Sequence, residues 1–134
     1  MAREVLLDKE TIIVSETDKN GRIIYVNDDF CNICGYSKDE LIGKAHNIVR
    51  HKDMPKVAFE GLWDTISKMK IWNGIVKNST KDGGFYWVNA TIFSSQSADG
   101  NLRYISVRVK PTDKEVADAS ALYKKLIQEE ADVL

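Results

Sequence analysis

Hydrophobic and polar residues alternate along this chain in two rhythms, one typical of strands and one typical of helices. Runs of β-branched and other apolar residues at positions 12–14 and 23–26 predict two short strands. The polar sequence at 18–21 between them ends in Gly21, which can adopt the positive φ that a tight turn requires. The chain is therefore predicted to begin with a β-hairpin.

Three further segments in the second half are of strand length, at 72–79, 85–94 and 102–110. Glycine-containing turn sequences at 81–84 and 98–101 join them. These segments predict an antiparallel three-stranded unit.

Helix-capping residues mark the segment between the hairpin and this unit. Asn27 and Asp28 can cap a short helix over 29–33, and Gly35 can end it. Ser37 and Glu40 have the spacing of a capping box, which predicts a second brief helix that ends at Gly43.

Two longer helices follow from apolar residues that recur every three or four positions. Asp53 is predicted to cap the first of them, with Pro55 in its opening turn. Its predicted buried face comprises Val57, Ala58, Leu62, Trp63 and Ile66. Thr112 and Glu115 form a second capping box, which begins the final helix. The apolar stripe of that helix comprises Val116, Ala119, Leu122, Tyr123, Leu126 and Ile127.

This order of elements predicts an α+β fold. The simplest packing is a five-stranded antiparallel sheet with short helices over one face and a C-terminal amphipathic helix. A cavity is expected between the sheet and the helical crossover. The architecture resembles the PAS fold, with a lead-in at 1–10, the PAS domain at 11–111 and the C-terminal helix at 112–134.

Composition narrows the class of protein. The 134 residues suffice for one domain, and 43% apolar with 29% charged residues is ordinary for a soluble globule. A net charge of −1 gives no reason to expect nucleic acid or a membrane surface as partner, and no apolar run is long enough to insert into a bilayer. The two cysteines and the absence of a secretory signal favour a cytoplasmic location.

The densest polar chemistry lies at 46–55, where His46, Arg50, His51 and Asp53 occur within a few residues. One interpretation is a solvated loop in which Asp53 only caps the next helix. The other is a pocket for a charged ligand, since an arginine can bind a phosphate or a carbonyl group through two parallel hydrogen bonds. The residues alone leave both interpretations open.

The same run carries a resemblance to a known family, the flavin-binding PAS domains of bacterial aerotaxis (energy-taxis) receptors and their stand-alone relatives. The matching residues are Asn27-Asp28, Gly35-Tyr36, His46-Asn47-Ile48-Val49-Arg50-His51 with Asp53-Met54-Pro55, Trp72, Gly74-Ile75-Val76-Lys77-Asn78, Tyr86-Trp87-Val88, Thr112-Asp113 and Leu122-Tyr123-Lys124. The resemblance covers nearly the whole chain.

The resemblance implies FAD held without a covalent bond, whose redox state reports electron transport or oxygen. The family's cofactor-linked positions fall on Asn27, Arg50, His51 and Asp53. It also implies signalling to a chemotaxis transducer rather than catalysis. Because no membrane segment, HAMP-like linker or methyl-accepting helix follows, we expect a sensory fragment or a soluble subunit beside a separate transducer, recruited to the membrane if that transducer is membrane-bound.

Strand alternation adds further candidates for the pocket. Trp72 and Asn78 share one face of their predicted strand, and an amide side chain suits the donor–acceptor edge of a flavin; Trp72 could equally be core. Arg108 resembles in position the glutamine that contacts the flavin in light-sensing relatives. A cation at this position would raise the reduction potential of a bound flavin. The alternative is a solvated arginine on the outer face of the sheet. His46 resembles in position their photoreactive cysteine, so a thiol adduct is not expected.

Several alternatives remain open from the sequence. FMN could replace FAD, or haem could be bound with His46 or His51 as axial ligand. A third interpretation is a cofactor-free interaction module, and the final helix could form a homodimer. Cys31 and Cys34 have redox-pair spacing, but their predicted position inside a short helix favours core filling. No catalytic or metal-binding constellation is found, so the chain is not expected to be an enzyme.

Overall fold

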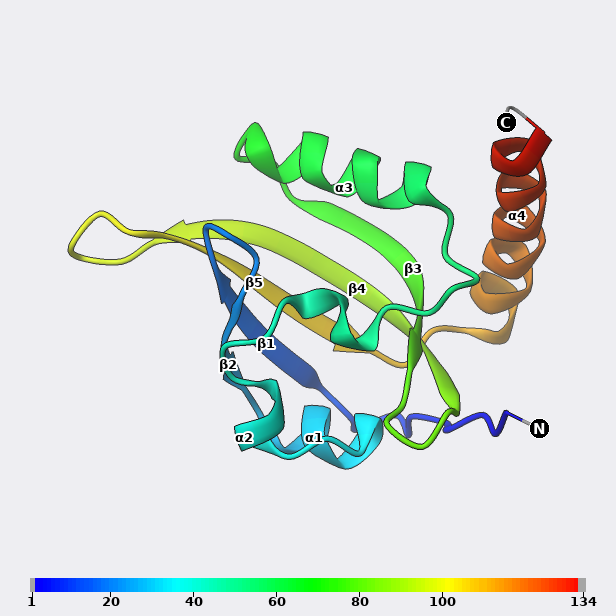
Figure 1. The fold of residues 1–134 in the computed structure, drawn as a ribbon, viewed down its shortest axis with the longest axis horizontal. Coiled ribbons are helices and arrows are strands. Elements are labelled where there is room, and N and C mark those ends of the chain that lie inside the picture. The colour runs from blue at the N-terminus through cyan, green and yellow to red at the C-terminus, as the bar shows by residue number, and fades with distance from the viewer. Residues whose placement is uncertain (1, 133–134) are drawn as a thin grey trace.

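A curved five-stranded antiparallel sheet forms the centre of the protein in the computed structural model, which describes residues 2–132 (Figure 1). The strands are β1 (Ile13–Asp18), β2 (Ile23–Val26), β3 (Trp72–Ser79), β4 (Phe85–Gln96) and β5 (Leu102–Val109). The helices are α1 (Asp28–Cys34), α2 (Lys38–Leu41), the short 3₁₀ helix η1 (His46–Val49), α3 (Lys56–Ser67) and α4 (Asp113–Asp132).

The strands lie in the order β2-β1-β5-β4-β3, and every neighbouring pair is antiparallel. The β1–β2 hairpin and the β3–β4–β5 unit are those that the sequence predicts. They join through β1 and β5, while the crossover from α1 to α3 covers one face of the sheet (Figure 1). The PAS-like α+β architecture is confirmed, and β1 and β4 are longer than predicted.

The predicted caps organise the start of the crossover. The side chain of Asn27 accepts a hydrogen bond from the Phe30 amide at 3.1 Å, and Gly35 ends α1 with φ +83°. Ser37 and Glu40 form both hydrogen bonds of a capping box around α2. These local hydrogen bonds satisfy amides that would otherwise have no partner at the helix ends.

The predicted cap of α3 is wrong. The helix begins at Lys56 with Pro55 at the N-cap position, and no side chain of its own loop caps it. Asp53 lies too far upstream, and its carboxylate instead accepts a hydrogen bond from Lys77 Nζ at 2.7 Å. The loop before α3 is thereby tied to β3.

The buried face of α3 is narrower than its sequence predicts. Leu62 and Ile66 are buried, whereas Val57 and Trp63 are each 44% exposed. The ring of Trp63 forms an edge-to-face contact with Tyr104 on β5, with ring centroids 5.5 Å apart. The sequence also gave no prediction of η1, which contains His46.

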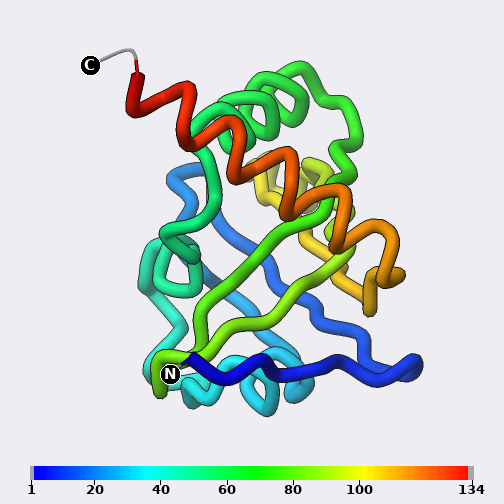
Figure 2. The backbone as a smooth tube through the Cα atoms, turned by 90° about the vertical axis from the view of Figure 1, so that its right-hand side faces the viewer, coloured from blue at the N-terminus to red at the C-terminus, as the bar shows by residue number. Residues whose placement is uncertain are grey.

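Helix α4 runs across β3, and its C-terminal half lies beside the start of α3 (Figure 2). Its predicted capping box is present, with Glu115 accepting from the Thr112 amide at 2.9 Å. Tyr123 stacks on Trp87 with an interplanar angle of 16°. Among the described part of the helix only Ala119 is fully buried, so α4 packs lightly; residues 133–134 of its predicted span lie outside the described residues.

The hydrophobic core occupies part of the space between the inner face of the sheet and the crossover. Its fully buried members include Ile13, Ile23, Phe30, Leu41, Tyr86 and Val88. Cys34 belongs to this core, which confirms its predicted filling role, and burial raises the pKa of its thiol. Within residues 2–132, none of the helices combines the length and apolar character needed to cross a membrane.

Candidate functional site

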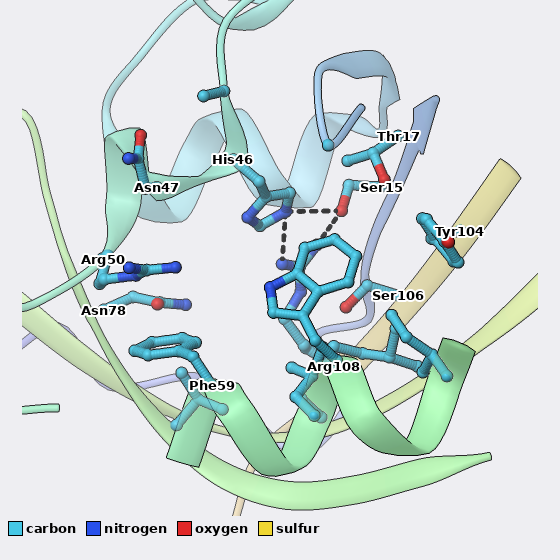
Figure 3. Close-up of a pocket in the computed structure, with 18 of the residues that line it drawn as sticks. Ser15, Thr17, His46, Asn47, Arg50, Phe59, Asn78, Tyr104, Ser106 and Arg108 are labelled. Carbon is cyan, nitrogen blue, oxygen red and sulfur yellow. Dashed lines mark hydrogen bonds between the residues drawn. The ribbon is translucent and has the colours of Figure 1, made fainter. Parts of the chain in front are cut away.

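A cavity of about 270 Å³ lies between the inner face of the sheet, η1 and α3 (Figure 3). Four of the residues predicted from the sequence line it: His46, Arg50, Asn78 and Arg108. Apolar side chains from the sheet and from α3 form much of the remaining wall. The cavity is slightly smaller than the roughly 300–1,000 Å³ of ordinary small-molecule pockets.

Strand register explains why these side chains meet. Alternate residues of a strand point to the same face, and Tyr104, Ser106 and Arg108 all face the cavity from β5. Ser15 on β1 lies directly opposite Ser106, and Ala90 on β4 lies opposite Arg108.

Arg108 is a buried cation without an acidic partner. It is 3% exposed, and among residues 2–132 no carboxylate forms an ion pair with it. Its Nη2 donates to Ser15 Oγ at 2.6 Å and its Nη1 donates to His46 Nε2 at 3.2 Å, but its Nε has no partner. Burial lowers the pKa of Arg108 to about 10. The guanidinium therefore stays charged at neutral pH, and the interpretation as a solvated arginine is wrong.

His46 is held in its neutral form by the same network. Its Nε2 receives the Arg108 donor and lies 3.0 Å from Ser15 Oγ (Figure 3). Because a guanidinium can only donate, Nε2 must be the unprotonated nitrogen, which places the ring proton on Nδ1. Burial, together with the charge of Arg108, lowers the pKa of His46 to about 3.

Arg50 and Asn78 form a second polar group at the cavity. The guanidinium carbon of Arg50 lies 3.7 Å above the centre of the Phe59 ring, a cation–π contact with α3. The backbones of Arg50 and Asn78 pair as an isolated β-bridge, which brings the loop against β3. Asn78 is 5% exposed and lines the cavity as the strand alternation predicts.

The other half of the polar run lies outside the cavity. Neither His51 nor Asp53 lines it. Instead, Asp53 forms an ion pair with Lys77, and the Asp53 amide donates to His51 Nδ1 at 3.0 Å. Lys77 is the neighbour of Asn78 on β3 and points to the opposite face. The run therefore wraps the edge of the sheet, with Arg50 on one side and Asp53 on the other.

Asn27 and Trp72 also lie outside the residues that line the cavity. The side chain of Asn27 bonds β1 as well as α1, through the Val14 amide at 3.0 Å and the Ile12 carbonyl at 2.8 Å. The indole of Trp72 lies flat over Gly74, where an added Cβ would come within 2.5 Å of the ring. Their observed contacts are structural.

Several lining residues were not singled out as ligand contacts from the sequence. Ser15 could have been found by the alternation along β1, which places it opposite Ser106. Phe59 and Trp63 could not, because helical periodicity shows which face is apolar but not which part of that face borders a hollow. Both line the cavity from α3.

The donor set defines the ligand chemistry of the site. A buried guanidinium with an unused N–H and a buried amide point to a ligand with carbonyl-type acceptors or negative charge. Val76, Ile92 and Leu62 supply apolar walls for a flat ring. Metal binding has no comparable support, since residues 2–132 contain no cluster of three or more candidate ligands.

Comparison with known proteins agrees with this architecture. Residues 23–115 match the family model described as the PAS fold. This chain belongs to the PAS family. A solved structure of similar shape is the dark form of the blue-light photoreceptor Aureochrome1 LOV, with a TM-score of 0.68 at 20% identity, covering 91% of this chain and 86% of that one.

Among curated relatives, the chain is similar to the aerotaxis receptor of Escherichia coli K12. The two are 42% identical over 120 residues, which is 90% of this chain and 24% of the receptor. The nitrogen fixation regulatory protein of Klebsiella oxytoca is 27% identical over 74% of this chain and 20% of its own length. The chain thus spans about a quarter or less of the length of these relatives.

Proposed function

We propose that this protein is a redox or oxygen sensor that binds FAD non-covalently and signals to a chemotaxis transducer. The observation that carries the proposal is Arg108, a buried cation that has no counter-ion among the described residues and whose Nε has no hydrogen-bond partner. A buried charge of this kind is stabilised by a ligand that brings carbonyl oxygens or negative charge. When bound, the flavin supplies reversible electron acceptance.

The chain's own residues have distinct tasks in this proposal. Arg108 supplies a positive charge beside the ring, which favours the reduced, electron-rich form. Ser15 and His46 hold the guanidinium in place through their 2.6 and 3.2 Å contacts. Asn78 offers a donor and an acceptor to the polar edge of the ring.

The volume of the cavity suits a ring system better than an entire dinucleotide. Arg50 is more exposed than Arg108 and lies over Phe59 at the cavity wall. We therefore assign Arg50 to the FAD phosphates, which would lie outside the cavity. His51 and Asp53 contribute by holding the loop that carries Arg50, since Asp53 is tied to Lys77. Asn27 and Trp72 contribute through the packing of the surrounding elements.

The proposed partner is a chemotaxis transducer. Similarity to an aerotaxis receptor supports a signalling rather than an enzymatic role, which we propose is carried out in the cytoplasm. Homodimerisation through α4 is supported by Leu122, which is 51% exposed on that helix. Light scattering should then show a dimer that Leu122→Glu converts to monomer; equal masses for the two proteins would exclude this interface.

The central experiment is to purify the protein gently, record its absorption spectrum and identify the released cofactor by mass. A flavin spectrum with FAD mass is expected, and an FMN mass would correct the cofactor. A Soret band would indicate haem, although His46 Nε2 is already engaged by Arg108 and Ser15. A colourless protein that binds no added FAD would leave a cofactor-free module and overturn the proposal.

A further inference from the structure

The N-terminus of α3 is capped by a residue from the far end of the chain. The first amides of any helix lack partners within it, and Pro55 offers no side-chain cap here. The Val57 amide instead donates to Glu130 Oε2 on α4 at 3.1 Å, across 73 positions of sequence. Both ribbon views place the C-terminal half of α4 beside this end of α3 (Figures 1 and 2).

We propose that Glu130 forms a latch between α4 and α3, through which a displacement of the cavity wall changes the docking of the C-terminal helix. This inference rests on the proposed sensory function, which it deepens by naming the route of the signal. It concerns a contact that is already complete in the described chain and involves no cavity ligand.

A second anchor holds α4 to the sheet. The Tyr123 hydroxyl donates to the Ile75 carbonyl in β3, and its ring stacks on Trp87. Nearer the start of the helix, Glu115 accepts from Asn89 Nδ2 at 3.1 Å. Glu115, Tyr123 and Glu130 are spaced by about two helical turns each, so a single side of α4 carries all the anchors.

The two ends of this anchored side reach different walls of the cavity. Glu130 contacts the Val57 amide of α3. Phe59, which lies within one helical turn of Val57, lines the cavity. Tyr123 contacts β3 at Ile75, next to Val76, which also lines the cavity. Helix α4 therefore bridges α3 and β3, and it is placed to respond to a change in the separation of these walls.

The strength of the contact suits a reversible latch. A carboxylate at a helix N-terminus is stabilised by hydrogen bonds from the N–H groups and by the helix dipole. This stabilisation is enough to shift the equilibrium between docked and undocked α4 severalfold, but not to make docking permanent. Apart from the anchors at Glu115 and Tyr123, α4 is lightly packed, because Ala119 is its only buried described residue and Leu122 is half-exposed. Lightly packed elements of this kind open locally without unfolding the domain.

The test measures amide hydrogen exchange in residues 56–60 and in α4. Glu130→Ala should accelerate exchange in both segments about three- to thirtyfold, whereas Glu130→Gln, which keeps an acceptor oxygen, should fall between it and wild type. Glu129→Ala is the matched control, because Glu129 is exposed and adjacent on the same helix. Equal exchange in the Glu130→Ala and Glu129→Ala proteins would show that no latch exists.

A double-mutant cycle tests the coupling without any cofactor. Phe59→Ala alters the cavity wall on α3, and it should accelerate exchange in α4 when Glu130 is present but add nothing in the Glu130→Ala background. Additive effects would overturn the coupling. Reduction of the FAD-loaded protein should change α4 exchange in the same Glu130-dependent way. A cycle that shows coupling in a protein that binds no flavin would support the latch while refuting the proposed function.

Discussion

Arg108 shows most clearly how a single side chain defines the site. Its position on β5 aims it inward, and its only polar contacts are Ser15 and His46. Neither neighbour is an anion, and the guanidinium otherwise makes a cation–π contact with Phe30, whose ring centre lies 4.7 Å from the guanidinium carbon. Among the described residues, the positive charge therefore has no counter-ion inside the cavity. A buried charge is costly unless it is paired, and this cost is the physical reason for expecting an electron-rich ligand.

Arg108→Gln is expected to lower the reduction potential of the bound flavin by about 30–60 mV, or about 1.4–2.8 kcal/mol for a two-electron couple. The substitution keeps a donor but removes the positive charge. Arg103→Gln is the control, because Arg103 lies on the same strand, faces the other side and pairs with Glu16. Redox titration checks the prediction, and a shift of equal size in both variants would contradict a local role for Arg108.

His46 makes a separate prediction about pH. Its folded-state pKa of about 3 is below the unfolded value near 6.5, so the unfolded chain binds the extra proton between these values. Stability is therefore expected to fall as pH falls through this window, by up to about 1.4 kcal/mol per pH unit from this group. Urea unfolding at pH 6.5 and at pH 5 should show that the free energy of unfolding falls less in the His46→Asn protein than in the wild type. An identical pH slope in the two proteins would contradict this.

At the scale of elements, the short crossover helices depend on side-chain caps. Asn27 joins β1 to α1 through three hydrogen bonds, to Val14, Ile12 and Phe30. The loop before α3 depends in a similar way on the ion pair between Asp53 and Lys77. These contacts position η1 and α3, which form the helical wall of the cavity.

Asn27→Ala is expected to lower the free energy of unfolding by about 2 kcal/mol, because it removes a helix cap together with two bonds to β1. Ser37→Ala removes only the cap of the four-residue α2 and should cost about 1 kcal/mol or less. Chemical denaturation measures both values. If Asn27→Ala left stability unchanged but abolished flavin binding, Asn27 would act in direct contact with the cofactor instead.

For the molecule as a whole, a cavity at the centre of the fold links ligand binding to stability. A ligand that binds only the folded state stabilises it in proportion to the logarithm of its concentration over Kd, by about 2.7 kcal/mol at one hundred times Kd. Flavin removal should therefore lower Tm by several degrees, and FAD should restore it. Thermal unfolding with added adenosine diphosphate is the control; restoration by that nucleotide alone would place the binding energy outside the ring cavity.

The sequence predicted most elements of this fold because their signals are local. The capping residues around α1, α2 and α4 have partners within a few positions, and the turns before β2, β4 and β5 contain glycines. Alternation along β5 also placed Arg108 on one face with Tyr104 and Ser106, but it did not decide which face borders the cavity. The cap of α3 was predicted wrongly because the groups that compete for Asp53 and for the Val57 amide, Lys77 and Glu130, are distant in sequence.

The amino-acid sequence by itself determined the strands, most helix boundaries and which residues share a face of β5 with Arg108, since these follow from backbone periodicity and short-range hydrogen bonds. Only the tertiary structure decided how the polar run 46–55 is divided. It placed Arg50 at the cavity and Asp53 on the opposite side of β3, joined to Lys77. The reason is that a chain segment crossing a sheet edge presents neighbouring residues to opposite faces, and one-dimensional spacing does not reveal where that edge lies.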